Sequence, residues 1–214
     1  MDAKAKIYRE KAEKVIENLK KRNMNGIYCE NRKQAVEEIL KMIPDNALVG
    51  LGGSETILET GLVDALRKRN IRLLDRYKEG VSKEEVDAMR REGLLSDVYI
   101  ASSNAITVDG KLVNMDGTGN RVAAMIFGRK KVVLMAGMNK VVRTVEDAIS
   151  RIKNHAAPLN TVRVKKETPC YHLGYCNDPH CFPPNRICSQ LVILESSMVP
   201  GRVTVVLVGE DLGY

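Results

Sequence analysis

The chain has 214 residues, of which 44% are hydrophobic and 29% are charged, a balance typical of folded globular proteins rather than of disordered chains. No apolar run approaches the roughly 18 residues that a transmembrane helix needs. Residues 1–6 carry charges instead of beginning an apolar segment, so we expect no signal peptide. These features predict a cytoplasmic protein without a membrane span.

Basic residues exceed acidic ones by 34 to 27, which gives a formal net charge of +7. The two kinds of charge are interleaved along the chain, and aromatic residues are scarce, with no Trp and only two Phe. The sequence thus lacks the basic, aromatic-rich strands of many nucleic-acid-binding proteins, and a nucleic-acid partner is not expected. The mild basic excess fits an anionic small molecule as partner.

The N-terminal segment has the periodicity of a helix with a single apolar stripe. The stripe consists of Tyr8, Ala12, Val15, Ile16 and Leu19. We expect residues 1–22 to form a helical arm that precedes a single domain of residues 23–214. The stripe packs either on this chain or on a second copy of it. Packing on a second copy would make the protein a homo-oligomer.

Helices and strands alternate through most of the remaining chain. Helical patterns cover residues 32–43, 57–68, 82–93, 120–127 and 144–156, and short apolar runs typical of buried strands cover residues 47–51, 71–74, 98–101, 131–135, 191–194 and 203–208. This alternation predicts an α/β fold with a mainly parallel sheet and flanking helices.

Capping residues indicate where three of the helices begin. Asn31 is expected to cap the helix at residues 32–43. The pairs Ser82 with Glu85 and Thr144 with Asp147 have the spacing of capping boxes.

Two further signals concern a helix end and a turn. Pro158 is expected to limit the helix that begins at residue 144. The pair Asp109 and Gly110 stands between two apolar runs and predicts a hairpin with a two-residue turn. This hairpin would add an antiparallel element to the mainly parallel fold.

A glycine-rich turn follows the strand expected at residues 47–51. Gly52 and Gly53 precede Ser54 and Thr56 at the start of a helix. Such a turn exposes backbone N–H groups at the positive end of the helix, which suits a phosphate or a carboxylate. Because strand ends in such sheets usually host ligands, we expect these four residues to bind an anion. The alternative is a tight turn with a structural role only.

A second polar turn spans residues 114–121. Asp116, Asn120 and Arg121 offer a carboxylate, an amide and a guanidinium group there, and Asn104 ends an earlier strand that can face the same cleft. We expect Asn104, Asn120 and Arg121 to bind the ligand and Asp116 to act as a general base. The alternative is that Asp116 and Asn120 brace the turn while Arg121 pairs with a surface acid.

Four of the five cysteines gather in a Pro-rich loop at residues 169–189. They are Cys170, Cys176, Cys181 and Cys188. In a reducing compartment such a group favours metal binding or redox activity over a disulfide framework. Four thiolates suit an iron–sulfur cluster, with zinc as the alternative, so we expect these cysteines to be metal ligands. The alternative interpretations are buried thiols and adventitious oxidation.

Several segments, in the same order, resemble the LUD (lactate utilisation) domain family, formerly a domain of unknown function. They are residues 50–54, 102–105, 114–123, 137–140, 186–188 and 206–213. The resemblance covers nearly the whole chain. It implies an α/β fold similar to the NagB/RpiA/CoA-transferase type. It also implies a setting in L-lactate oxidation, where larger members work with iron–sulfur and flavin-type partners.

Three functions are therefore carried forward. The leading hypothesis is a subunit or accessory of an iron–sulfur redox system that oxidises lactate or a related 2-hydroxy acid, working with redox partner subunits. The alternative is a stand-alone enzyme that acts on a sugar phosphate or a CoA ester. A second alternative is a non-catalytic, metal-binding interaction module. Whether the isolated chain is an enzyme stays open at this point.

Overall fold

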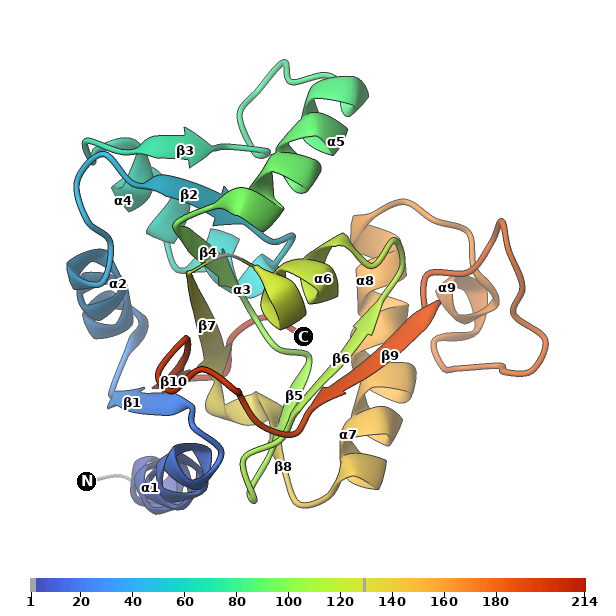
Figure 1. Ribbon diagram of the computed structural model, residues 1–214. Helices are drawn as coiled ribbons and strands as arrows, with labels where there is room; N and C mark the ends of the chain where they lie inside the picture. The colour runs from blue at the N-terminus through green and yellow to red at the C-terminus, as the bar shows by residue number, and fades with distance from the viewer. Residues whose placement is uncertain (1–2, 129) are drawn as a thin grey trace.

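The computed structural model describes residues 3–128 and 130–214, and ten strands in that part of the chain form two sheets (Figure 1). The larger sheet is entirely parallel, in the order β1 (Asn25–Cys29), β10 (Val203–Val208), β7 (Lys131–Gly137), β4 (Val98–Ala101), β2 (Leu48–Leu51), β3 (Arg72–Leu74). The smaller sheet is mixed, in the order β8 (Val141–Val142), β5 (Ala105–Thr107), β6 (Leu112–Asp116), β9 (Gln190–Leu194). The expected α/β fold with a mainly parallel sheet is confirmed.

Helices flank the larger sheet on both faces, because alternate residues of a buried strand point to opposite sides. Val133 and Met135 of β7 pack with α2, α3 and α4, whereas Val132 and Leu134 pack with α1 and α6. The helices are α1 (Ala3–Lys21), α2 (Arg32–Lys41), α3 (Glu55–Glu59), α4 (Leu62–Arg67), α5 (Lys83–Glu92), α6 (Asn120–Phe127), α7 (Val145–Arg151), α8 (Ala157–Arg163) and α9 (Pro169–Leu173). The apolar core is thus split into two layers by the sheet.

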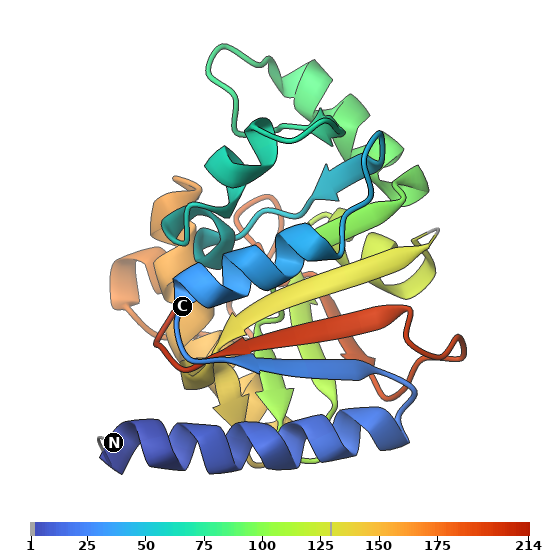
Figure 2. The ribbon, with the colours of Figure 1, turned by 90° about the vertical axis from the view of Figure 1, so that its left-hand side faces the viewer.

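The N-terminal helix α1 lies along the β1 edge of the larger sheet (Figure 2). Its Ala12, Val15 and Leu19 are completely buried in the core. Gly26 of β1 permits the close approach, because a Cβ there would lie 2.7 Å from Cγ1 of Ile16. The apolar stripe therefore packs on this chain's own sheet, and of the arm expected at residues 1–22, the first two residues lie outside the described part.

The helix expected to end before Pro158 instead continues to Arg163. Between α7 and α8 the chain makes a π-helical turn, Ile152–Ala156, in which the Ala157 amide donates to the Ile152 carbonyl. Pro158 was expected to end the helix because it lacks an N–H and because its ring would clash with the carbonyl one regular turn earlier. A widened turn removes that conflict without ending the helix.

Two other local expectations also need correction. The helix expected at residues 57–68 is divided into α3 and α4 at Gly61, whose φ of 74° is left-handed and interrupts a regular helix. The hairpin turn has three residues rather than two, because the Thr107 amide donates to the Lys111 carbonyl and Gly110 alone has a positive φ, 88°. A three-residue loop of this kind needs one left-handed residue.

The capping predictions are confirmed. Asn31 accepts from the Gln34 amide at 3.0 Å, and both capping boxes form, at Ser82 and at Thr144. Each cap satisfies an amide that the first helical turn leaves free. These caps fix the entry points of α2, α5 and α7, and α7 leads towards the site described below.

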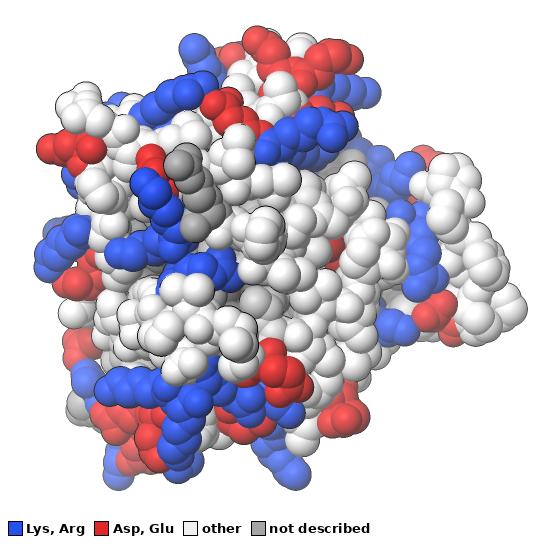
Figure 3. All heavy atoms as spheres, viewed as in Figure 1, with Lys and Arg blue, Asp and Glu red and all other residues white. Residues whose placement is uncertain are grey.

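Within the described part of the chain, no helix is both long and apolar enough to cross a bilayer. On the face drawn in Figure 3, basic and acidic side chains alternate around a largely uncharged centre. The excess of positive charge is therefore not gathered into one broad patch on this face.

Candidate functional site

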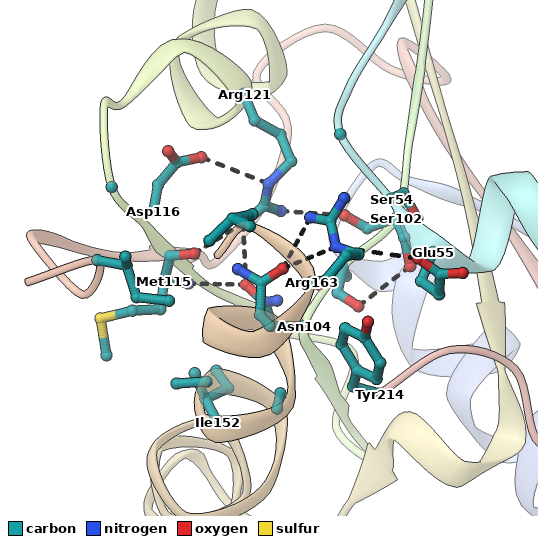
Figure 4. A pocket seen from close by; sticks show the side chains of 18 of the residues that line it. Ser54, Glu55, Ser102, Asn104, Met115, Asp116, Arg121, Ile152, Arg163 and Tyr214 are labelled. Carbon is teal, nitrogen blue, oxygen red and sulfur yellow. Dashed lines mark hydrogen bonds and ion pairs between the residues drawn. The ribbon is translucent and has the colours of Figure 1, made fainter. Parts of the chain in front are cut away.

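A polar cleft of about 250 Å³ lies where three parallel strands of the larger sheet end (Figure 4). The segments that follow β2, β4 and β7 supply part of its lining, and the turn before α6, the π turn and α8 supply most of the rest. Ligands in parallel sheets bind at this carboxyl edge. Of the eight residues predicted to bind the anion or act as a base, seven line the cleft: Gly53, Ser54, Thr56, Asn104, Asp116, Asn120 and Arg121.

The glycine turn is tightly fastened. Gly52 is not among the lining residues, because it packs on the strands beneath, where a Cβ would lie 2.9 Å from that of Ala101. The Ser54 amide donates to the Tyr77 hydroxyl at 2.8 Å, and that hydroxyl donates to the Gly52 carbonyl at 2.9 Å. The Ser54 hydroxyl caps α3 through the Ile57 amide. The Ser54 amide and side chain are thus already engaged within the protein.

Arg121 is buried, and its guanidinium group donates four hydrogen bonds to oxygen atoms of the fold and one to the Met125 sulfur. Nη1 donates to the Ser102 carbonyl at 3.0 Å and to Oδ1 of Asn114 at 2.6 Å. Nη2 donates to Oδ1 of Asn104 and to the Met115 carbonyl, both at 2.9 Å. Burial lowers the pKa of Arg121. Because its donors are used in this way, Arg121 holds the walls of the cleft together.

Asp116 and Asn120 hold the turn that precedes α6. Asp116 Oδ2 lies 3.4 Å from Nε of Arg121, and its Oδ1 accepts from the Gly119 amide at 3.0 Å. Asn120 Oδ1 accepts from the Thr118 hydroxyl at 2.9 Å. Gly119 itself has a φ of 85°, which the turn requires. In this arrangement both side chains brace the turn, and Arg121 is paired with Asp116 rather than with a surface acid.

Lys140 is one of several cleft residues that sequence reasoning missed. Its Nζ donates to the Thr56 hydroxyl at 2.7 Å and to the Ser102 hydroxyl at 3.2 Å. No carboxylate within the described residues forms an ion pair with it. Burial, helped by the positive charges of Arg151 and Arg121, lowers the pKa of Lys140 to about 7. Such a lysine changes protonation near neutral pH, as a general acid or base does.

Basic side chains outnumber acidic ones around the cleft. Among the described residues they are Arg76, Arg90, Arg121, Lys140 and Arg163, against Glu55 and Asp116. Asp116 is already paired with Arg121, and Glu55 Oε2 lies 3.9 Å from Nε of Arg163, a long ion pair. The cleft is therefore electropositive, which fits an anionic ligand.

The four clustered cysteines line a second, smaller pocket beside the cleft. They are Cys170, Cys176, Cys181 and Cys188, and Cys188 lines the cleft as well. All four thiols are free, and burial raises the pKa of Cys188 to about 11, with the neighbouring thiols adding to the shift. Within residues 3–128 and 130–214, no three His, Cys, Asp or Glu side chains are grouped so as to hold a metal ion. The thiols converge without forming a ready ligand set.

Arg186 lies among these thiols and fastens the loop. Its Nη1 donates to the Cys181 carbonyl at 2.6 Å and its Nε to the Cys188 carbonyl at 2.7 Å. Asp178 pairs with Arg186 at 3.2 Å and with Lys153 of the π turn at 2.8 Å. The loop is thereby tied to the helix that lines the cleft. The remaining cysteine, Cys29, is a buried core residue.

Comparisons with known proteins identify the family. No curated protein sequence matches the chain. The crystal structure of a DUF162 family protein from Deinococcus radiodurans is similar at 11% sequence identity and a TM-score of 0.51, over 94% of this chain and 97% of that one. Ribose 5-phosphate isomerase A from Neisseria gonorrhoeae is 17% identical over 59% of this chain and 64% of that one, with a TM-score of 0.35. A model of the LUD domain matches residues 12–208, so the chain belongs to the LUD domain family.

Proposed function

We propose that this LUD-domain protein binds lactate or a related 2-hydroxy acid in the polar cleft, as a subunit or accessory of an iron–sulfur redox system that oxidises it. The observation that carries the proposal is the excess of basic side chains around a cleft at the carboxyl edge of the sheet. A carboxylate is attracted to such a cleft, whose low-dielectric walls strengthen the field. The family's link to lactate utilisation points to the same ligand class.

Lys140 gives the cleft a group that can handle the proton of a 2-hydroxyl. In its neutral form the Nζ atom can accept that proton, and in its charged form it can bind the carboxylate. The hydroxyls of Thr56 and Ser102 hold the Nζ atom in place. Oxidation of a 2-hydroxy acid to a 2-oxo acid removes two protons and two electrons. This chain would accept the hydroxyl proton at Lys140, and the redox partner subunits would accept the two electrons together with the second proton.

Titration calorimetry with L-lactate at pH 7 tests the binding. The wild-type protein should bind lactate, and Lys140→Met should bind it at least about ten-fold more weakly, because one charge-assisted contact contributes about 1.5–3 kcal/mol. The exposed Lys20→Met on α1 is the matched control and should leave the affinity unchanged. If the wild-type protein binds neither lactate, glycolate nor 2-hydroxybutyrate, the proposal is wrong.

The redox role is tested separately. The chain purified anaerobically with its partner subunits should support lactate-dependent reduction of an artificial electron acceptor, and the chain alone should not. Turnover of phosphosugars or CoA esters by the isolated chain would instead favour the stand-alone enzyme. Partner subunits that reduce the acceptor equally well without this chain would contradict an accessory role.

Metal binding by the cysteine loop is a second candidate function, favoured because all four cysteines line one pocket. We propose that Cys170, Cys176, Cys181 and Cys188 hold an iron–sulfur cluster, or zinc as the alternative, once the loop closes around it. As described above, the side chains do not present a ready ligand set, so binding requires the loop to rearrange. An iron–sulfur cluster there would supply a one-electron carrier beside the cleft.

Anaerobic reconstitution with iron and sulfide tests this candidate. The wild-type protein should gain visible absorption and iron, and the double variant Cys176→Ser, Cys181→Ser should not. Cys29→Ser is the control, because this thiol lies in the core away from the loop. Binding of zinc alone favours the zinc alternative, and a metal-loaded protein that binds no anion favours the interaction module. Anaerobic protein without iron or zinc overturns the candidate.

A further inference from the structure

Three arginines line the cleft from three separate segments. Arg76 follows β3, Arg90 lies on α5, and Arg163 ends α8. Repulsion from Arg90 and Arg163 adds to the effect of burial in lowering the pKa of Arg76. Like charges held this close disfavour one another unless an anion lies between them.

Arg76 is the least compensated of the three. Within the described part of the chain it forms no ion pair and no side-chain hydrogen bond. Its Cζ atom lies 5.9 Å from the centroid of the Tyr77 ring. Its Nη1 lies 3.4 Å from where a Cβ of Gly53 would stand, so the guanidinium covers the glycine turn. Gly53 thus leaves room for this group at the surface of the cleft.

Arg90 and Arg163 also keep donors unused. Nε of Arg90 is buried and has no hydrogen-bond partner among the described residues, although Nη1 bonds to Asp87 at 2.6 Å. Arg163 is oriented by a neutral amide, since its Nε and Nη2 donate to Oδ1 of Asn160 at 3.0 Å and 2.7 Å. The amide fixes the guanidinium without neutralising its charge, and Glu55, at 3.9 Å from Nε, forms only a long ion pair with it. A buried donor such as Nε of Arg90 is costly unless it is hydrogen-bonded, so an acceptor on a bound ligand would stabilise it.

We infer that the cleft has a second anion subsite, in which Arg76, Arg90 and Arg163 bind a phosphate group, so that its ligand is a phosphorylated 2-hydroxy acid. The hydroxy-acid half rests on the proposed function, and the phosphate half rests on the arginines alone. A phosphate suits the set better than a second carboxylate. It has three peripheral oxygens that can accept from several guanidinium groups, whereas a carboxylate has two.

The matched ligands glycerate and 3-phosphoglycerate, which differ only in the phosphate, test the inference by titration calorimetry in 0.15 M NaCl. The wild-type protein should bind 3-phosphoglycerate at least about ten-fold more tightly than glycerate. In Arg76→Gln this preference should fall to about two-fold, with glycerate binding little changed, because the lost contact concerns the phosphate alone. Arg143→Gln, an exposed arginine outside the cleft lining, is the control and should keep the full preference.

The outcomes separate the two proposals. Equal binding of glycerate and 3-phosphoglycerate, or a preference that survives in Arg76→Gln, overturns the phosphate subsite and leaves the proposed function standing. If 3-phosphoglycerate and inorganic phosphate bind through Arg76 while glycerate and lactate do not bind, the subsite stands and the proposed function fails. No binding by any of the four overturns both. Should Arg76→Gln not fold, Arg163→Gln takes its place with the same expected loss.

Discussion

The cleft and the cysteine pocket adjoin one another but are built in different ways. The cleft stands on the ends of buried parallel strands, and Arg121 joins its walls by hydrogen bonds to the ends of β4 and β6. The cysteine pocket is formed by the loop at residues 169–189, where α9 supplies one short turn of regular structure. Ala157, Ile187 and Cys188 line both, so the rigid framework directly adjoins a loop that is fastened mainly by Arg186.

The two regions differ in how far they are organised before a ligand arrives. In the cleft, the polar atoms of Arg121, Asp116 and Lys140 already have partners inside the protein. In the cysteine pocket, the thiols are free and only converge. Preorganised groups bind without a large ordering cost, whereas a metal in the loop must supply the order itself. The predictions below measure how far this contrast holds.

The largest effect is expected from Arg121→Leu. The substitution leaves the Asp116 carboxylate and two backbone carbonyls without their partner in a buried setting. Breaking a buried pair from one side typically costs about 3–5 kcal/mol. Urea unfolding should show a loss of that order, and Arg143→Leu, an exposed arginine, should stay within about 0.5 kcal/mol of the wild-type protein. A loss below about 1 kcal/mol would mean that the cleft is no more rigid than the loop.

A smaller effect is expected from the titration of Lys140. Its pKa is lowered to about 7 in the folded protein and returns to the ordinary lysine value of 10.5 on unfolding. Between these values the unfolded state binds the extra proton, so this group makes stability rise with pH. The slope is at most about 1.4 kcal/mol per pH unit. Below about pH 7 both states are protonated and the contribution no longer changes.

Unfolding measured from pH 6 to pH 9 checks this prediction by difference. The wild-type protein should gain about 2 kcal/mol relative to Lys140→Met between pH 7 and pH 9. Parallel curves for the two proteins would show that Lys140 is neutral or charged throughout this pH range. That result would contradict its proposed role in proton transfer.

The smallest effect is expected in the cysteine loop. The double variant Cys176→Ser, Cys181→Ser changes two partly exposed thiols and should alter the free energy of unfolding by less than about 1 kcal/mol. In anaerobic protein supplied with iron and sulfide, the difference in free energy of unfolding between the wild-type protein and the variant should increase, because a bound cluster stabilises only the wild-type chain. A loss of 2 kcal/mol or more without metal would show that the loop is as firmly packed as the cleft.

The sequence predicted the elements whose signals are local. Apolar runs marked the central strands, and side-chain caps such as Ser82 and Thr144 marked helix starts that the structure reproduces. The strand β1 escaped because it begins with Asn25 and Gly26, which break an apolar pattern. Gly26 is needed there for packing against α1, a contact between elements that a local pattern does not reveal.

The site could be predicted only where polar residues directly follow an expected strand in the sequence. The segments containing Ser54 and Asp116 stand out as polar turns directly after strands, and both line the cleft. Lys140 also follows a strand, β7, but the sequence does not reveal its burial, which depends on the central place of β7 in the sheet. Arg76 and Arg163 belong to segments distant in the chain that only folding brings to one cleft.

The π turn between α7 and α8 sets the direction in which the side chains of α8 point. Each residue of a regular helix advances the direction of the side chains by about 100°. The widened turn at Ile152–Ala156 holds one residue more than a regular turn would, and Asn160 and Arg163 follow it. If the same residues formed a regular helix without the widened turn, both side chains would swing by about that angle relative to α7. The widened turn is therefore as strict a requirement of the site as the identity of its arginines.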